Sequence, residues 1–346
     1  MRSIHRQVFM CAVALGTLAP LAEGGPIAPP PGPVAPTQKT VITTLPYAIN
    51  SSGSYQIWSN LTGLAGADGI TINADDVTID LNGFALLGGP GAQSGVFIDT
   101  TGGLGRNITI KNGSIRDWDV DGIRGTGGWA TTVQDIWCDN TAGMGINITN
   151  QSTVVDCVVT NSALDGITGT AGCTVINCRT RMCTGTGIVV QDGSIALNCT
   201  SFGNADGYTA IESSVIQDCI AIGNTNFGAI LDFGSTITGC TIRHSGGSGI
   251  ECLNENVVEN NRLSMNVNAG IGAGINVVGS TNRIVGNSVI SLPGGGAVGI
   301  DVLTAQNTVY DNSGTNGAPD FQAVPGNDLG TLAPAAAGIA KSNAPY

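Results

Sequence analysis

Short runs of alternating apolar and polar residues recur along this chain with a period close to 21 residues. Six such repeats align between Ile146 and Gly270, and five of them carry a cysteine in one column, at steps of 21, 21, 20 and 21 residues. Apolar residues stand three positions before this cysteine and two positions after it. Alternation on both sides of one position predicts two short strands in each repeat, each with one side facing a core.

The residue just before the cysteine column predicts a sharp corner between these two strands. It is always Asp, Asn or Gly, the residue types that enter the left-handed backbone region most readily. We therefore expect an asparagine ladder at this corner and a cysteine ladder beside it. The corner column is Asp156, Asn177, Asn198, Asp218, Gly239, Asn260, Gly286 and Asp311. The cysteine column is Cys157, Cys178, Cys199, Cys219 and Cys240, with Asn261 in the next place.

A repeat of this length with short strands is typical of a solenoid, because one unit buries too little apolar surface to fold alone. A second column, of glycine, marks the end of each repeat; Gly122, Gly145 and Gly166 are its first members. The pattern predicts an all-β fold, a single right-handed parallel β-helix of about 11 to 12 coils over residues 41–317. With 52 glycines and 11% charged residues, the composition suits short strands and tight turns.

The two ends of the chain do not follow the repeat. Residues 1–24 have two arginines, an apolar run and then small residues, which predicts a secretory signal peptide and an extracellular or periplasmic location. Residues 25–40 form a proline-rich linker. The apolar run of the leader, about fifteen residues, is too short to span a bilayer, and no other transmembrane segment is expected. Residues 318–346 form either a loose tail or a strip that packs on the last coil and covers its strand edges.

The cysteines of the repeat are expected to be buried thiols rather than disulfides. Export alone would favour disulfides for the nine cysteines that remain beyond the leader. Side chains at one place in successive coils are separated by the strand spacing of about 4.8 Å, whereas a disulfide needs Cβ atoms about 3.5 to 4.5 Å apart. The column therefore predicts unpaired thiols that pack as small hydrophobic groups.

Several motifs resemble one known superfamily. These are the opening VITTLPYAINSSGSYQIWSNLTG, the segment DDVTIDLNGF at Asp75–Phe84, NITIKNGSIRDW at Asn107–Trp118, and the two ladders. Together they resemble secreted bacterial right-handed β-helix proteins of the pectin-lyase-like superfamily. Characterised members are mostly polysaccharide lyases, hydrolases and epimerases, beside adhesins and phage spikes. The resemblance implies the fold and a polysaccharide partner, and it leaves the chemistry open.

No complete catalytic motif accompanies this resemblance. The Gly-His-Gly and Arg-Ile-Lys motifs of galacturonan hydrolases with this fold are absent from the sequence. Calcium-dependent lyases of the fold need a carboxylate cluster and a basic residue, and beyond the leader the chain has only three lysines, Lys39, Lys111 and Lys341, and one histidine, His244. A polysaccharide lyase is one hypothesis and a non-catalytic protein is another.

Three aspartates suggest a calcium site. Asp117, Asp119 and Asp121, followed by a glycine, match the start of an EF-hand loop, but Gly128 stands where that loop needs a glutamate. The alternative is that Asp121 belongs to the Asp-Gly pairs that end the coils and that the other two are ordinary turn residues.

Arginines and tryptophans suggest a surface for an acidic glycan. Five arginines fall at outward positions of the strand after the corner, although the chain has a net charge of −12. Guanidinium groups bind carboxylates in pairs of hydrogen bonds, so this face could hold a uronic-acid chain. The candidate substrate-binding residues are Arg116, Trp118, Arg124, Trp129, Trp137, Arg179 and Arg181. The other two arginines of the face are Arg243 and Arg262.

Two interpretations of the function remain open at this stage. One is a glycan-interacting protein, and the other is a structural or adhesive rod whose arginines are only solvated surface. Nucleic acid is an unsuitable partner because the chain is acidic and carries an export signal. The oligomeric state does not follow from the sequence.

Overall fold

The computed structural model describes residues 39–103, 105–267, 272–290, 298–315, 321–332 and 341–344. These residues form strands, turns and bends without a helix, so the predicted all-β fold is confirmed. The expected signal peptide, and the linker up to residue 38, lie outside the described residues. Within the described residues there is no helix long and apolar enough to cross a membrane.

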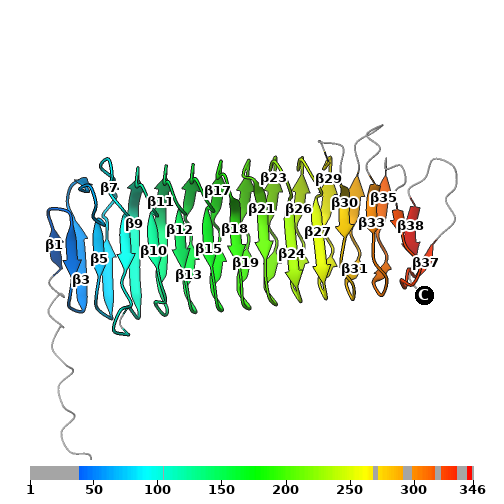
Figure 1. Ribbon diagram of the computed structural model, residues 1–346, viewed down its shortest axis with the longest axis horizontal. Coiled ribbons are helices and arrows are strands. Elements are labelled where there is room, and N and C mark those ends of the chain that lie inside the picture. The colour runs from blue at the N-terminus through cyan, green and yellow to red at the C-terminus, as the bar shows by residue number, and fades with distance from the viewer. Residues whose placement is uncertain are drawn as a thin grey trace, which may run out of the picture. The chain divides into compact units, whose positions relative to one another are not determined.

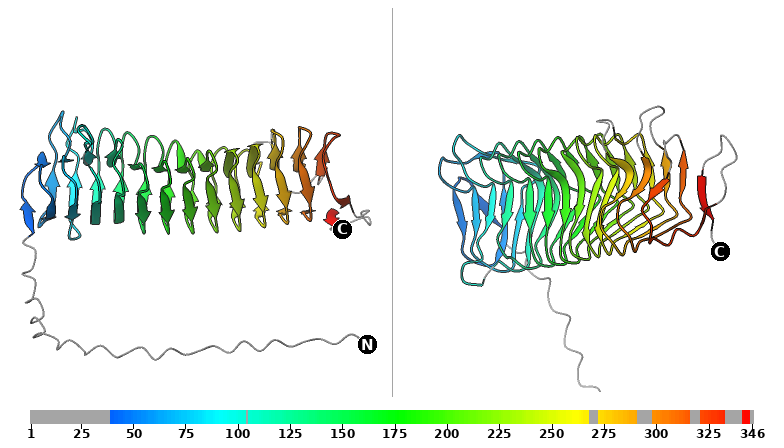
Figure 2. Two further views of the ribbon diagram at one scale, coloured as in Figure 1. Left: turned by 90° about the horizontal axis from the view of Figure 1, so that it is seen from below. Right: turned by 45° about the vertical axis from the view of Figure 1, so that its right-hand side comes forward.

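The chain winds into coils of three short strands, and the strands of successive coils pair in parallel along the row that Figure 1 shows. One stack of strands forms a 13-stranded sheet, and all but its last strand precede residue 317, which agrees with the predicted number of coils. The other two stacks are joined at the corner into a 25-stranded sheet. Figure 2 shows the same row of coils from two further sides.

We call the 13-stranded sheet the first stack. Its strands are β2 (Tyr47–Ile49), β5 (Ile70–Ile72), β8 (Val96–Ile98), β10 (Ile123–Gly125), β12 (Ile146–Ile148), β15 (Ile167–Gly169), β18 (Thr186–Val190), β21 (Asp206–Ala210), β24 (Ala229–Phe233), β27 (Ile250–Asn254), β30 (Ala273–Val277), β33 (Val298–Val302) and β36 (Phe321–Ala323).

The second stack precedes the corner. It contains β1 (Thr40–Ile42), β3 (Gly53–Ile57), β6 (Val77–Asp80), β9 (Ile108–Arg116), β11 (Thr132–Asp139), β13 (Thr153–Val155), β16 (Thr174–Ile176), β19 (Ile195–Leu197), β22 (Val215–Gln217), β25 (Thr236–Thr238), β28 (Val257–Glu259), β31 (Arg283–Val285) and β34 (Thr308–Tyr310).

The third stack follows the corner, and the long strands β9 and β11 continue into it. Its other strands are β4 (Leu61–Thr62), β7 (Ala85–Leu87), β14 (Val158–Thr160), β17 (Arg179–Arg181), β20 (Thr200–Phe202), β23 (Ile220–Ile222), β26 (Thr241–Arg243), β29 (Arg262–Ser264), β32 (Ser288–Ile290) and β35 (Ser313–Thr315). Strands β37 (Thr331–Leu332) and β38 (Lys341–Ala344) complete the described chain.

The predicted left-handed corner is confirmed. All eight residues of the corner column have positive φ, between 52° for Asp218 and 67° for Gly239. Amide side chains connect successive corners, since Asn198 Nδ2 donates to Asn177 Oδ1 at 2.8 Å and Asn177 Nδ2 donates to Asp156 Oδ1 at 3.2 Å. The residue types that allow the turn therefore also bond one coil to the next.

The cysteine column lies in the core, directly inside this corner. All five thiols are buried and none forms a disulfide. The backbone N–H of Cys178 donates to the Sγ atom of Cys199 in the next coil at 3.4 Å, and the N–H of Cys240 donates to Asn261 Oδ1 at 2.9 Å. The sulfur and amide acceptors thus satisfy backbone donors that the corner leaves unpaired inside the protein.

The glycine column is explained by close packing rather than by an unusual turn. A Cβ atom on Gly145 would lie 2.2 Å from Val159 Cγ1 and 2.7 Å from the carbonyl oxygen of Gly166. Its φ is outside the left-handed region. Only glycine fits here, because the backbone passes against the core side chains and the next coil at the same point.

The described parts of the C-terminal segment pack on the last coils. Strand β36 adds to the first stack in parallel, and Phe321 packs against the core. Strand β38 pairs antiparallel with β35 and with β37. An antiparallel strand covers the edge that the parallel coils would otherwise expose.

Candidate functional site

A second left-handed corner, which we did not predict, leads from the third stack to the first. Its residues include Asp117, Asn140, Asn161 and Met182, with φ values of 65°, 53°, 56° and 56°. Each stands five positions after a residue of the first corner, which also includes Asn112 and Asp135, both with positive φ. This fixed offset is the sequence signal that could have revealed it.

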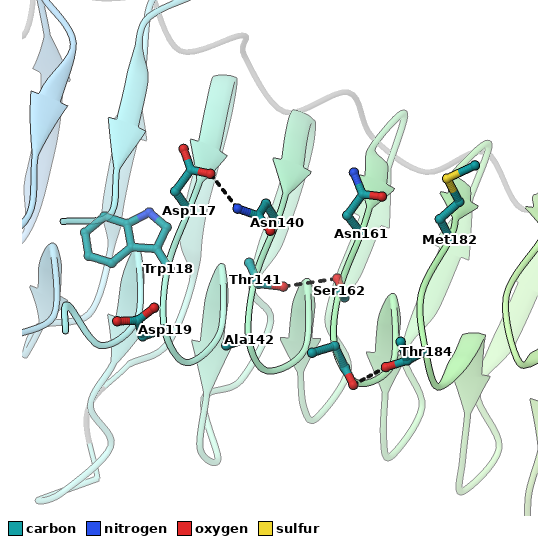
Figure 3. A pocket seen from close by; sticks show the side chains of 11 residues that line it. Asp117, Trp118, Asp119, Asn140, Thr141, Ala142, Asn161, Ser162, Met182 and Thr184 are labelled. Atoms are coloured by element: carbon teal, nitrogen blue, oxygen red, sulfur yellow. Dashed lines mark hydrogen bonds between the residues drawn. The ribbon is translucent and has the colours of Figure 1, made fainter. Parts of the chain in front are cut away.

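A groove runs across the coils beside this second corner. Its first part has a volume of about 370 Å³, and Figure 3 shows its side chains in rows. The corner rim is the row Asp117, Asn140, Asn161 and Met182. The loop rim is the row Asp119, Ala142 and Thr184, with Ala163 at the same offset in its own coil. The floor between them is Trp118, Thr141 and Ser162.

The groove continues beyond Met182. A second hollow of about 340 Å³ is lined by Met182, Cys183, Thr184, Gly203, Asn204, Ala205 and Thr225. Because both hollows share Met182 and Thr184, they form one depression along the coils. We use the term groove for both parts together.

Hydrogen bonds between coils hold the polar side chains of the corner rim in place. Asn140 Nδ2 donates to Asp117 Oδ1 at 2.7 Å, and Asn161 Nδ2 donates to Asp139 Oδ1 at 2.8 Å. On the floor, Thr141 Oγ1 donates to Ser162 Oγ at 3.1 Å. The rim therefore presents ordered carboxylate and amide groups at the coil spacing of about 4.8 Å.

Arginine and aromatic side chains lie on the outward side of the third stack, immediately before the corner rim. Strand pairing runs from Arg116 through Asp139 and Thr160 to Arg181, which places Arg116 and Arg181 three coils and about 14 Å apart, as the sequence predicted. Arg181 pairs in register with Phe202, and its guanidinium carbon lies 5.5 Å from that ring centroid. Arginine and aromatic groups thus border the groove over several coils.

Three of the predicted binding residues are not placed to hold a ligand in the groove. Trp118 lines the floor of the groove, but its indole is only 1% exposed and donates from Nε1 to the carbonyl oxygen of Leu86, so the ring is not available to stack on a ligand. Arg124 belongs to β10 of the first stack, where it lies over Phe97, so it is not on the arginine face. Trp129 is half exposed in the loop before β11 and does not line the groove.

The three aspartates of the expected calcium loop do not converge on a common point. Asp117 accepts from an amide of the next coil, Asp119 Oδ2 accepts from the backbone N–H of Gly91 at 2.5 Å, and Asp121 Oδ1 accepts from that of Met144 at 2.7 Å. Among the described residues, no group of three or more His, Cys, Asp or Glu side chains is arranged to hold a metal ion. The three aspartates are therefore not arranged as the calcium ligands of an EF-hand loop.

Asp121 instead belongs to the Asp-Gly pairs that end the coils. In the same way Asp165 accepts from the backbone N–H of Thr186 at 2.7 Å, and Asp206 accepts from that of Phe227 at 3.0 Å. Burial raises the pKa of Asp121 and of Asp165 above the ordinary value of an aspartate. These carboxylates are structural acceptors between coils.

The basic residues considered for lyase chemistry lie outside the groove. Lys111 pairs in register with Asp80 and Gln134 in the second stack. His244 has the left-handed conformation of the second corner but does not line either part of the groove. Neither residue is placed to abstract a proton from a ligand in the groove.

Comparisons with known proteins agree with this architecture. Residues 166–314 match the family described as a right handed beta helix region. The structure is similar to the A-module of mannuronan C-5 epimerase AlgE6 from Azotobacter vinelandii, with 14% identity, a TM-score of 0.62, and coverage of 80% of this chain and 89% of that one. The A-module of AlgE4 from the same organism gives 16% identity, a TM-score of 0.55, and coverage of 81% and 90%.

A phage protein is similar as well. A mutant tailspike protein of E. coli bacteriophage HK620, in complex with a pentasaccharide, gives 12% identity and a TM-score of 0.60, with coverage of 77% of this chain and 66% of that one. A search of curated protein sequences found no match. At these identities the likenesses establish the fold, a right-handed parallel β-helix, and leave the function to be argued from the groove.

Proposed function

We propose that this right-handed β-helix protein binds polysaccharide, with the glycan chain lying along the coils in the groove. The observation that carries this proposal is the continuous groove from Asp117 to Thr225, whose corner rim presents ordered polar groups in three successive coils of its first part. An elongated depression with repeated polar groups suits a linear polymer better than a compact ligand.

Sugar hydroxyls need partners of the kind that the rim offers. Asp117 supplies a carboxylate, and Asn140 and Asn161 supply amides that can both donate and accept. The fold supports the same class of ligand, because the similar structures include mannuronan epimerase modules and a tailspike with a bound pentasaccharide.

The arginines beside the groove favour an acidic glycan, such as a chain of uronic acids. Arg116 and Arg181 directly precede Asp117 and Met182 of the corner rim, and Arg179 is exposed on the same strand as Arg181. Guanidinium groups there can bind carboxylates of a chain whose hydroxyls face the rim. A length of about 14 Å between Arg116 and Arg181 is comparable to a few sugar units.

Binding of oligogalacturonate and oligoalginate, measured by titration calorimetry at low and moderate salt, tests the proposal. The double variant Arg179→Ala, Arg181→Ala is expected to bind more weakly, most clearly at low salt, because exposed charges are screened over about 8 Å at physiological ionic strength. Arg243→Ala, Arg262→Ala is the matched control, since these arginines occupy the same two columns of the third stack but belong to coils beyond those that the groove covers.

Three results would decide between the candidate functions. Glycan binding in the groove is supported if Arg179→Ala, Arg181→Ala binds more weakly than the parent and the control variant does not. Failure of the parent protein to bind either oligomer would favour the structural or adhesive rod. Release of unsaturated uronides, measured by absorbance, would show lyase action in addition to binding. We further propose, from the leader in residues 1–24, that the protein acts in the periplasm or outside the cell.

A further inference from the structure

The corner rim has polar side chains up to Asn161 and loses them from Met182 onward. The three rim residues before it are Asp117, Asn140 and Asn161, whereas the corner residue after it is Gly203. The Met182 side chain is 51% exposed and lines both parts of the groove. A flexible thioether therefore stands where the polar part of the groove meets its second part.

The second part of the groove offers few polar groups to a ligand. Its surface includes Met182, Ala205 and the threonines Thr184 and Thr225, and no charged side chain lines it. The one amide there, Asn204, is buried and already bonded, because its Oδ1 accepts from the N–H of Cys183 at 2.8 Å and its Nδ2 donates to Ser201 Oγ at 2.7 Å.

A sugar chain that follows the groove meets polar groups in the first part and mostly apolar surface in the second. A sugar hydroxyl turned into the second part would lose water without gaining an equivalent partner, which costs free energy. A methyl group on an acyl substituent would instead gain contact with apolar surface. The volume of about 340 Å³ leaves room for a sugar residue with a small substituent.

We propose that the second part of the groove holds an acetylated sugar residue, and that Met182 determines this specificity by contacting the acetyl methyl group. The inference rests on the proposed glycan binding and adds the substituent that the groove selects. The polar rim from Asp117 to Asn161 then binds unsubstituted residues of the same chain, and Met182 marks the position of the acetylated one.

The experiment compares partially O-acetylated oligoalginate with the same material after mild alkaline removal of its acetyl esters. We expect the parent protein to bind the acetylated form about tenfold more tightly, the discrimination available to a small apolar group in such a pocket. Met182→Gly should lose this preference and bind both forms as the parent binds the deacetylated one. Glycine suits the left-handed backbone of Met182 at φ 56°, so the fold should be kept.

Met265→Gly is the matched control. Met265 is a methionine of the same corner column, with φ 55°, and lies outside the groove. This variant should keep the parent's preference for the acetylated form. Equal binding of both forms by the parent would overturn the inference and leave the proposed function standing. Binding of neither form, together with no binding of oligogalacturonate, would overturn both. Preference retained by Met182→Gly would overturn the role of Met182.

Discussion

The guanidinium carbon of Arg116 lies 5.6 Å from the ring centroid of Trp137, which belongs to the next coil. The indole is also held from its other end, because Trp137 Nε1 donates to Thr160 Oγ1 at 3.2 Å. The ring is thus fixed on the outward side of the third stack while almost half of it stays exposed. A fixed, exposed aromatic ring beside a groove is well suited to contact the apolar side of a sugar.

Removal of this ring should weaken glycan binding without unfolding the protein. We expect Trp137→Ala to lower the affinity for oligouronates by about tenfold, the scale of a moderate binding hot spot. Trp58→Ala is the control, since Trp58 is 65% exposed and lines neither part of the groove. The measurement is titration calorimetry after thermal unfolding has shown that both variants fold. Equal losses in the two variants would remove Trp137 from the binding surface.

The left-handed corner can be tested by two substitutions at one position. Asn177→Val should destabilise the protein by about 1 to 3 kcal/mol, because a β-branched residue would be forced to the positive φ of Asn177. Asn177→Gly should change the stability far less, although it loses the exposed amide bonds to the neighbouring coils. Chemical denaturation gives both values. Equal stabilities of the two variants would contradict the left-handed conformation of Asn177.

Asp121 should make the protein less stable as the pH rises. Burial raises its pKa in the folded state above the ordinary value of 3.8, so the folded protein binds the proton more tightly than the unfolded chain does. Its contribution to stability is therefore fully present below pH 3.8 and is lost as the pH rises through the folded pKa. Asp121→Asn keeps an oxygen acceptor for the N–H of Met144 and removes this titration.

Urea denaturation of the parent and of Asp121→Asn at pH 4.5 and pH 7 measures this effect. The free energy of unfolding of Asp121→Asn minus that of the parent should be larger at pH 7 than at pH 4.5. A difference that is independent of pH, or that changes in the opposite direction, would show that Asp121 does not have the raised pKa.

The buried thiols should be chemically inert in the folded protein. The nine cysteines of the described chain are all buried and free, and burial raises the pKa of Cys138 and Cys252 well above the usual range of a thiol. Thiolate is the reactive form, so an aromatic disulfide reagent should titrate almost none of them until denaturant is added. Rapid reaction of several thiols in the native protein would contradict the register of the cysteine column.

The first corner could be predicted from the sequence because its column contains only residues that favour the left-handed region. The second corner could not be recognised from residue type alone, because Met182 and His244 share its column with asparagine and glycine. The residues of the corner rim cannot be identified from the sequence unless this second corner is recognised. Its position depends on how one coil stacks on the next.

Trp118 shows why nearness in the sequence misled the prediction of the site. It is one of the candidate binding residues and stands between the exposed Asp117 and Asp119, but its own side chain faces the core. Glycines make room for the indole there, since a Cβ atom on Gly63 or Gly69 would lie 2.5 or 2.6 Å from Trp118 Cη2. In a solenoid, residues a few positions apart point to different sides, whereas residues about 21 apart are neighbours.

The central claim is that a polysaccharide lies in the groove. A crystal structure of the protein soaked with an oligouronate tests it most directly. We predict density for the sugar chain between the corner rim and the loop rim, with hydroxyls bonded to Asn140 and Asn161 and a carboxylate near Arg116 or Arg181. Sugar density on the outward side of the first stack, or an empty groove at saturating oligomer, would contradict the claim.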